Sequence, residues 1–411
     1  MTEDAPKLAQ MVLAGEQQSA ATDLGAGIFM VRDISNLYLV TTGAGDVLVN
    51  TGFMTAAARN KAMIEAVRTG PLTHIILTQS HADHFGGVPT FQEAGTRIVA
   101  ERRFAETARY YRDIAPCTGP RQAKLWGSTV TSMGDVKTPE VEPDITVDGR
   151  LELDLGGRRF VLLSTPGGET VDSLTVWLPD DRIAFTGNLF GPIWLSMPFL
   201  NTIRGDKPRL VGRYLESLEI VRGLDAQTII TGHGDPIRGA DVKAGLDRMH
   251  DAVSWLNEAV IAGMNAGKDV YALMREISLP EHLRIGEFHG NVRWAVRAIY
   301  HEYVGWFLYD STTSLYGVPR SSVDRDLVDL AGGADALAAR AASHLAAGRP
   351  LEAMHLIDIA LGAEPANRAA LEAKRGALGR LLADGGGTNL SETMWLRSEI
   401  AAVDRALEPA G

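Results

Sequence analysis

Cysteine is almost absent from this sequence: Cys117 stands alone among 411 residues. A single cysteine cannot form an intramolecular disulfide, and it excludes the zinc sites that are built from several thiolates. Any metal site in this chain must therefore rely mainly on side chains other than cysteine.

Long apolar runs and blocks of basic charge are also missing. No apolar stretch reaches the roughly 18 residues that span a bilayer, and residues 1–20 lack the basic and apolar regions of a signal peptide. The 40 lysines and arginines are outnumbered by 51 aspartates and glutamates, which gives a formal net charge of −11. This acidic balance argues against nucleic acid and anionic membranes as partners. We therefore expect a cytoplasmic protein without membrane insertion. A small-molecule substrate is compatible with this charge, because a local basic pocket can exist on an acidic protein.

The texture of the chain changes near residue 240. Before it, short β-branched runs such as residues 73–78 and 158–165 alternate with glycine and proline breaks and with helical stretches, which is typical of an α/β fold. After it, residues 243–267 and 291–310 carry apolar side chains at helical spacing. Three segments are predicted: an N-terminal extension over residues 1–20, an α/β domain over 21–240 and an all-α helical domain over 241–411.

Within the helical domain, one stretch has the spacing of a tetratricopeptide-type helical hairpin. The residues that carry this spacing are Gly348, Ala353, Ala360 and Pro365. One unit is not an array, so the sequence predicts a small helical domain rather than a solenoid. An ordinary pair of helices stays open as the alternative.

The stretch TQSHADHFGG, residues 78–87, concentrates metal-binding side chains after a predicted strand. His81, Asp83 and His84 lie close together in it, so a tight loop lets them converge on one ion. Imidazole and carboxylate suit zinc, and manganese or iron are alternatives. An isolated histidine is most often a structural residue, but three such side chains before a glycine pair favour a metal site.

Four motifs in chain order resemble those of the metallo-β-lactamase fold. They are the histidine-rich loop at residues 78–87, TPGGET at 165–170, FTGN at 185–188 and TGHGDP at 231–236. The resemblance implies an αββα metallo-β-lactamase sandwich over the α/β domain, followed by the helical domain.

The same resemblance implies a site for two metal ions. The ligands implied for one ion are Asp83, His84 and His233, those for the other are Gln79, His81 and Glu169, and the position of a bridging carboxylate is Asn188. An amide oxygen is a weak zinc ligand, and without the bridging charge two dications repel each other. Asn50 likewise stands where the superfamily usually has an aspartate. We therefore expect Zn²⁺ as the cofactor, with one tight ion at Asp83, His84 and His233 and a weak or empty second site.

A narrower resemblance is to the alkyl sulfatases of this superfamily. Glu169 in TPGGE and Arg204 in TIRGDK match the glutamate of their third motif and the arginine that holds the sulfate group. Their dimerisation region is similar to residues 296–307, and the segment after it resembles residues 344–370 and 395–401. The resemblance stops short of a sterol-carrier-like C-terminal domain. It implies a homodimer formed through the helical domain.

These matches imply a hydrolase similar to an alkyl or aryl sulfatase, which cleaves an ester-type bond of an amphiphilic anion with a metal-activated water. In this scheme Asp83 binds the ion, and Glu169 or His81 orients the water or accepts its proton. Arg204 holds the anionic group. Trp194 and Phe199 belong to an apolar segment that is expected to contact the substrate, or alternatively the helical domain or a second subunit.

Two other functions stay open. A lactonase, carboxylesterase or phosphoesterase would use the same fold, and a pseudoenzyme would use it for binding alone. Tyr110, Tyr111 and Arg112 either line a pocket or pack in the core, and packing is the favoured interpretation. His289 is interpreted as a residue of the core or of a dimer interface.

Overall fold

The computed structural model describes residues 9–11, 15–126 and 137–408. Contacts divide the chain into two compact units, namely residues 1–123 with 127–302 and residues 124–126 with 303–411. The helices between residues 240 and 302 therefore group with the sheets, whereas the predicted domain boundary lies at residue 240.

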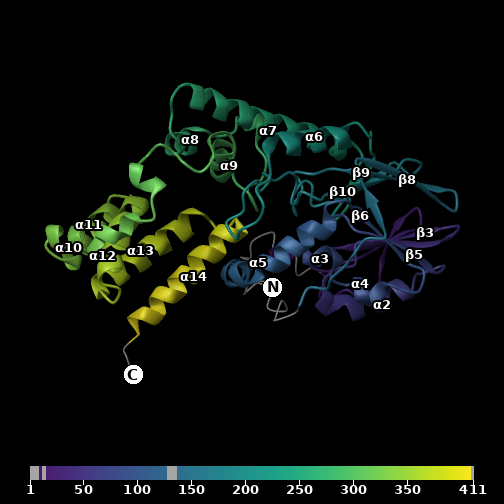
Figure 1. The fold of residues 1–411 in the computed structure, drawn as a ribbon, viewed down its shortest axis with the longest axis horizontal. Coiled ribbons are helices and arrows are strands. Elements are labelled where there is room, and N and C mark those ends of the chain that lie inside the picture. Colours follow the sequence, from purple (N-terminus) through teal and green to yellow (C-terminus); the bar gives the residue numbers. More distant parts are fainter. Residues whose placement is uncertain (1–8, 12–14, 127–136, 409–411) are drawn as a thin grey trace. The chain divides into compact units, whose positions relative to one another are not determined.

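The first unit is built on two β-sheets (Figure 1). Within the described residues, the first sheet has seven strands in the spatial order β1 (Thr22–Gly25), β2 (Ile28–Val31), β3 (Leu37–Thr42), β4 (Gly45–Val49), β5 (Leu72–Ile76), β6 (Arg97–Glu101) and β7 (Ile145–Val147). The second sheet, described over the same ranges, has six strands in the order β13 (Ile237–Arg238), β12 (Thr228–Thr231), β11 (Ile183–Gly187), β10 (Leu174–Leu178), β9 (Arg158–Ser164) and β8 (Arg150–Leu155). In the first sheet, the pairs β4–β5, β5–β6 and β6–β7 are parallel, and in the second sheet the pair β11–β12 is parallel.

Side-chain alternation along the strands builds the core between the sheets. In β3, Tyr38 and Val40 belong to the cluster between the two sheets, whereas Leu37 and Leu39 belong to the cluster on the outer face. The rings of Tyr38 and Phe185, which come from different sheets, lie 5.4 Å apart edge to face. Because successive side chains of a strand point to opposite faces, a run of apolar residues such as β3 is buried on both sides.

Helices cover both outer faces of the paired sheets. Those that pack on the first sheet are α2 (Ala57–Glu65), α3 (Ala82–Phe85), α4 (Val88–Phe91) and α5 (Phe104–Trp126). Those that pack on the second sheet are α6 (Val211–Arg222), α7 (Ala240–Asn265), α8 (Val270–Glu276) and α9 (Val292–Val304). Figure 1 shows α6 and α7 on one side of the sheets and α2 and α4 on the other. The predicted αββα sandwich is confirmed.

The second unit is helical, as the sequence predicts for the C-terminal region. Its longer helices are α10 (Asp324–Ala331), α11 (Ala334–Ala346), α12 (Pro350–Ala363), α13 (Arg368–Asp384) and α14 (Leu390–Leu407). Ala341 of α11 packs against Ala353 and Ile357 of α12, and Gly348 turns the chain between them with a φ of +72°. The helix pair is thus present, and its tetratricopeptide character stays a prediction. In the part of the chain that the structure describes, no helix combines the length and apolar character needed to cross a bilayer.

Candidate metal centre

The candidate metal centre lies where loops from the two sheets meet. Asp83 and His84 follow β5 on the short helix α3, and His233 follows β12 of the other sheet. The N–H of Leu174 in the second sheet donates to the Thr78 carbonyl at 2.8 Å, so the loop after β5 is joined directly to the opposite sheet. The sandwich thereby brings together two motifs that are far apart in sequence.

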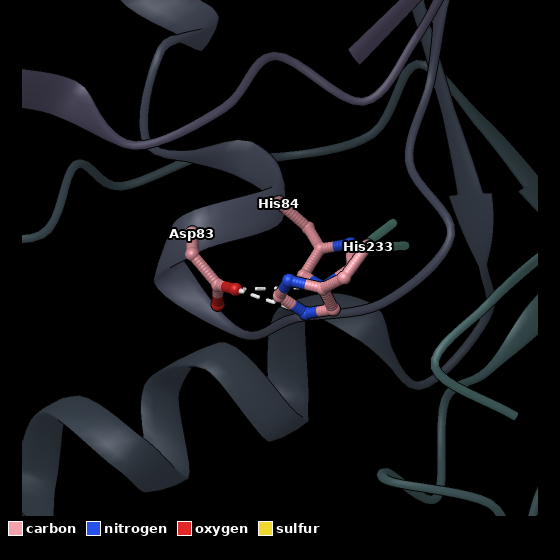
Figure 2. A group of neighbouring side chains, drawn as sticks. All are labelled: Asp83, His84 and His233. Atoms are coloured by element: carbon pink, nitrogen blue, oxygen red, sulfur yellow. Dashed lines mark ion pairs between the residues drawn. The ribbon is translucent and has the colours of Figure 1, made fainter. Parts of the chain in front are cut away.

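Asp83, His84 and His233 converge on one point (Figure 2). Asp83 Oδ2 lies 3.7 Å from His84 Nε2 and 3.8 Å from His233 Nε2. The three potential ligand atoms all lie within 4.8 Å of one another. The two imidazole rings are nearly perpendicular, at 86°, so they approach the point from different directions. We refer to these three residues as the ligand trio.

The backbone that carries two members of the ligand trio is held in place by hydrogen bonds. The Thr51 N–H donates to the His84 carbonyl at 2.8 Å, and Ser35 Oγ donates to the Asp83 carbonyl at 2.8 Å. A Cβ atom on Gly87 would lie 2.4 Å from the Thr51 carbonyl oxygen. The second glycine of the pair therefore permits the close approach that this packing requires.

Buried polar atoms without a hydrogen-bond partner lie at and beside the ligand trio, and they fit a bound cation. His233 Nδ1 must donate to the Ile34 carbonyl at 2.5 Å, so His233 Nε2 keeps its lone pair and contacts Asn188 Nδ2 at 3.1 Å. His84 Nε2 and Asn188 Oδ1 are buried without a hydrogen-bond partner among the described residues. A Cβ on Gly232 would lie 2.1 Å from Asn188 Oδ1 and 2.6 Å from the His84 ring. Because glycine has no side chain, Gly232 leaves room for this arrangement. The two imidazoles and the carboxylate of the ligand trio suit a divalent ion.

The protonation states of the ligand trio also suit a cation. Burial lowers the pKa of His84 to about 3, so its ring is neutral. Burial also lowers the pKa of His233. Burial raises the pKa of Asp83, but His84, His233, His81 and a backbone hydrogen bond together hold the pKa below its ordinary value. Two neutral imidazoles and one carboxylate are a ligand set that zinc sites use.

Asn50 contacts the far side of the His84 ring. Its Oδ1 accepts hydrogen bonds from the Thr78 N–H at 2.9 Å and from Thr78 Oγ1 at 3.1 Å. These two donors fix the amide so that Asn50 Nδ2 faces His84 Nδ1 at 3.1 Å. An amide N–H favours a lone pair on His84 Nδ1, whereas a histidine that binds a metal through Nε2 usually donates from Nδ1 to a carboxylate or carbonyl. Asn50 is therefore expected to lower the affinity of the ligand trio for a metal ion.

Changing Asn50 to aspartate is expected to tighten metal binding. A carboxylate would accept from His84 Nδ1 and leave Nε2 free for the ion. Partners of this kind typically change metal affinity by about 10- to 100-fold. Competition with a coloured chelator measures the affinity. Asn201→Asp adds the same charge at an exposed position and should leave the affinity unchanged. An Asn50→Asp affinity equal to that of the wild type would contradict this interpretation.

Gln79 and His81 are engaged with protein groups rather than with the ligand trio. Gln79 Oε1 accepts from the Asn188 N–H at 2.9 Å, and Gln79 Nε2 contacts His81 Nδ1 at 2.9 Å. On its other side, His81 Nε2 lies 3.3 Å from Tyr111 Oη and 3.6 Å from Asp206 Oδ2. Both residues thus have protein partners at the atoms that would bind an ion.

Glu169 is buried among positively charged and hydrogen-bonding groups. Its Oε2 lies 3.6 Å from Arg204 Nη2 and 3.7 Å from Arg209 Nη2, and its Oε1 lies 3.4 Å from His289 Nε2. Burial raises its pKa, but Arg209, His289 and Arg204 together hold the pKa of Glu169 well below its ordinary value. Glu169 is therefore a carboxylate, and its charge influences the pKa of His84 in the ligand trio.

Four residues of this site were not predicted from the sequence as site residues. They are Tyr111, Asp206, Arg209 and His289. Tyr111 Oη donates to Asp206 Oδ1 at 2.7 Å, a polar contact that the favoured interpretation of Tyr111 as a packing residue did not include. His289 is buried, as expected for a core residue, but it also contacts Glu169. Asp206 and Arg209 follow Arg204 closely in sequence, and this proximity could have identified them as site residues.

Phe199 and Trp194 lie in different surroundings. Phe199 packs edge to face on His289 at 4.8 Å and stacks on Trp294 at 5.3 Å, so it borders the group around Glu169. Trp194 packs on Phe190 at 5.5 Å and belongs to the layer of helices on the second sheet. Contact of either side chain with a substrate stays a prediction.

Comparison with known families gives two matches along the chain. Residues 30–233 match the metallo-beta-lactamase superfamily, and residues 271–390 match the alkyl sulfatase dimerisation family. The first match contains the ligand trio and Glu169, and the second begins in the helices that follow the sheets. The two matches follow the order expected from the sequence, with the metallo-β-lactamase motifs before the segment that resembles a dimerisation region.

Individual proteins that are similar to this chain include alkylsulfatases. A linear primary-alkylsulfatase of Pseudomonas sp. (strain ATCC 19151) is 25% identical over 72% of this chain and 61% of its own length. The alkyl/aryl-sulfatase BDS1 of Saccharomyces cerevisiae is 24% identical over 86% of this chain and 59% of its own. The chain thus spans about three fifths of the length of these two relatives, 61% of the first and 59% of the second.

A solved structure shows the same fold. The sec-alkylsulfatase Pisa1 from Pseudomonas sp. superimposes with a TM-score of 0.81 over 95% of this chain and 66% of that chain, at 21% identity. The two family matches and this fold agree with the ligand trio and with the layered sheets. The chain therefore carries a domain of the metallo-beta-lactamase superfamily over residues 30–233, followed by an alkyl sulfatase dimerisation domain over residues 271–390.

Proposed function

We propose that this protein is a metal-dependent hydrolase that cleaves the ester bond of alkyl or aryl sulfates, or of similar amphiphilic anions. One observation carries the proposal: a chain of contacts leads from the ligand trio to Arg204. It runs from His233 through Asn188, Gln79 and His81 to Asp206, which lies 3.8 Å from Arg204. A cation site and an arginine that suits an anionic group therefore lie at the two ends of one chain of contacts. The similarity to alkylsulfatases supports the choice of a sulfate ester.

The ligand trio would hold one tightly bound zinc ion. When bound, such an ion supplies a Lewis acid that lowers the pKa of a water molecule toward neutrality. The weak or empty second site is supported by the contacts of Gln79, whose Oε1 already accepts from the Asn188 N–H. Zinc is favoured over other metals because two imidazoles and a carboxylate form its common catalytic ligand set.

Glu169 would orient the attacking water rather than act as a strong base. Its pKa is held well below the ordinary value, chiefly by Arg209 and His289 against the effect of burial. A carboxylate with a depressed pKa accepts a proton poorly near neutral pH. His81, with Nε2 facing Tyr111 and Asp206, is the other candidate for moving a proton.

Arg204 would bind the anionic group of the substrate. Its side chain is 12% exposed, and its contacts with Glu169 and Asp206, at 3.6 and 3.8 Å, exceed hydrogen-bond length. Arg209, in contrast, hydrogen-bonds Asp206 at 2.7 Å and is 1% exposed. A guanidinium binds a sulfate-type anion with two parallel hydrogen bonds, so Arg204 is suited to this role. Phe199 and Trp194 are proposed to border the apolar part of the substrate.

The protein is also proposed to form a homodimer through its helical region. The match of residues 271–390 to a dimerisation family supports this assembly. Light scattering coupled to gel filtration measures the mass in solution, and a mass near the 44.3 kDa of one chain would contradict it. A cytoplasmic location stays a prediction.

The proposed reaction is tested with purified, zinc-loaded protein on a panel of substrates. The panel contains a long-chain alkyl sulfate, an aryl sulfate, a lactone, an aryl carboxylic ester and a phosphomonoester. We expect the alkyl or aryl sulfate to react fastest. A faster lactone, carboxylic ester or phosphoester would replace the sulfatase proposal with that activity. Normal zinc binding without hydrolysis of any substrate would favour a binding function.

A further inference from the structure

Two arginines and two carboxylates form a buried group beside the ligand trio. We call Glu169, Arg204, Asp206 and Arg209 the charge cluster. Arg209 donates from Nη2 to Asp206 Oδ2 at 2.7 Å and from Nη1 to the Phe199 carbonyl. The same Nη2 lies 3.7 Å from Glu169 Oε2. The guanidinium of Arg209 therefore contacts both carboxylates of the charge cluster.

The charge cluster is balanced without a metal ion. Glu169 and Asp206 contribute two negative charges, and Arg204 and Arg209 contribute two positive ones, because arginine stays protonated in proteins. The exposed side-chain fractions of Glu169, Asp206 and Arg209 are 4%, 3% and 1%. A dication placed against Glu169 would face a guanidinium only a few ångströms away, in a buried site where like charges repel strongly.

The charge cluster also contacts His81, which the family pattern would make a ligand of the second ion. Asp206 Oδ2 lies 2.7 Å from Arg209 Nη2 and 3.6 Å from His81 Nε2. Arg209 therefore positions a carboxylate beside His81, a residue that the family pattern gives to the second ion. Both Glu169 and His81 are linked to Arg209, one directly and one through Asp206.

We propose that the fixed charge of Arg209 takes the place of the second metal ion. This inference rests on the proposed single-ion site at the ligand trio. It attributes the weak or empty second site to the positive charge of Arg209 as well as to Gln79 and Asn188. Arg209 is a positioning residue: its guanidinium lies 2.7 Å from Asp206 and 3.7 Å from Glu169 and holds both carboxylates in place, as a cation at the second site would.

Zinc content per chain tests the proposal, measured by mass spectrometry after equilibration with buffered zinc. Every variant is made in an Asn188→Asp background, which restores the bridging carboxylate, and is named here by its further changes. Gln79→His restores an imidazole ligand but keeps Arg209, so this variant should still hold one ion. Gln79→His/Arg209→Gln removes the positive charge as well and should hold two. Gln79→His/Arg209→Lys keeps a positive charge and is the matched control, expected to hold one.

Removing Arg209 leaves two buried carboxylates short of positive charge, so a further variant protects the test against loss of folding. Gln79→His/Asp206→Asn/Arg209→Gln removes one charge of each sign and should also hold two ions. Two tightly bound ions in Gln79→His alone would overturn the proposal, and so would one ion in both folded variants that lack Arg209. Zinc binding by the wild type is independent of these outcomes: if the wild type holds no ion, the proposed function fails instead.

Discussion

Replacing Asp83 with alanine is expected to leave the protein without its tightly bound ion and without hydrolytic activity. Asp83 supplies the negative charge of the ligand trio, and its Oδ2 lies within 3.8 Å of both histidine nitrogens. Two neutral imidazoles alone would hold a dication weakly. Loss of the ion removes several kcal/mol of transition-state stabilisation, so kcat/KM should fall by more than about a thousandfold. Metal analysis and steady-state kinetics of the same preparation measure both effects.

Asp181→Ala is the matched control for this change. The Asp181 side chain is 24% exposed, compared with 18% for Asp83, and it pairs with Arg158 at 2.7 Å away from the ligand trio. This variant loses an ion pair but should keep the ion and the activity. Wild-type metal content in Asp83→Ala would show that the ion, if present, is held elsewhere.

Replacing Arg204 with alanine is expected to weaken the reaction of anionic substrates selectively. Arg204 contacts its carboxylate neighbours at 3.6 and 3.8 Å, so its N–H groups are available to an anion. Hydrogen bonds to charged groups contribute about 1.5–3 kcal/mol, which corresponds to a loss of about 10- to 150-fold in kcat/KM for a sulfate ester. A neutral lactone or ester lacks this group, so its slower hydrolysis should change little.

Two further variants separate anion binding from structural support. Arg213→Ala removes an exposed arginine of α6, with a side chain 61% exposed, and should leave all substrates unaffected. Arg204→Lys keeps the charge but loses the planar pair of donors, so it should recover only part of the activity. An equal loss on neutral and anionic substrates in Arg204→Ala would mean that Arg204 supports Glu169 rather than the substrate.

The parts of the site that lie close together in sequence were predictable from the sequence. Asp83 and His84 are adjacent on one short helix, and their chemistry identifies a metal site without knowledge of the fold. His233 comes from the other sheet and was found through the order of four motifs. The prediction that Gln79 is a poor ligand agrees with its contacts, because its amide oxygen accepts a backbone N–H.

The charge cluster was not predictable in the same way. Asp206 is of a residue type usually found at the surface, and its burial depends on contacts with Tyr111 and Arg209. Nothing in the local sequence indicates which distant elements will surround it. The same holds for α7: the spacing of its apolar residues predicts a helix, but it does not reveal that Leu246 and Met249 pack in the layer on the second sheet.

The central claim is that this chain holds one tightly bound ion at Asp83, His84 and His233. The measurement that tests it most directly is the metal content per chain of the wild-type protein, purified without added chelator. We expect about one zinc ion per chain. Two tightly bound ions would show that Gln79 or Asn188 takes part in a second site, and no ion at all would contradict both the metal centre and the proposed hydrolase.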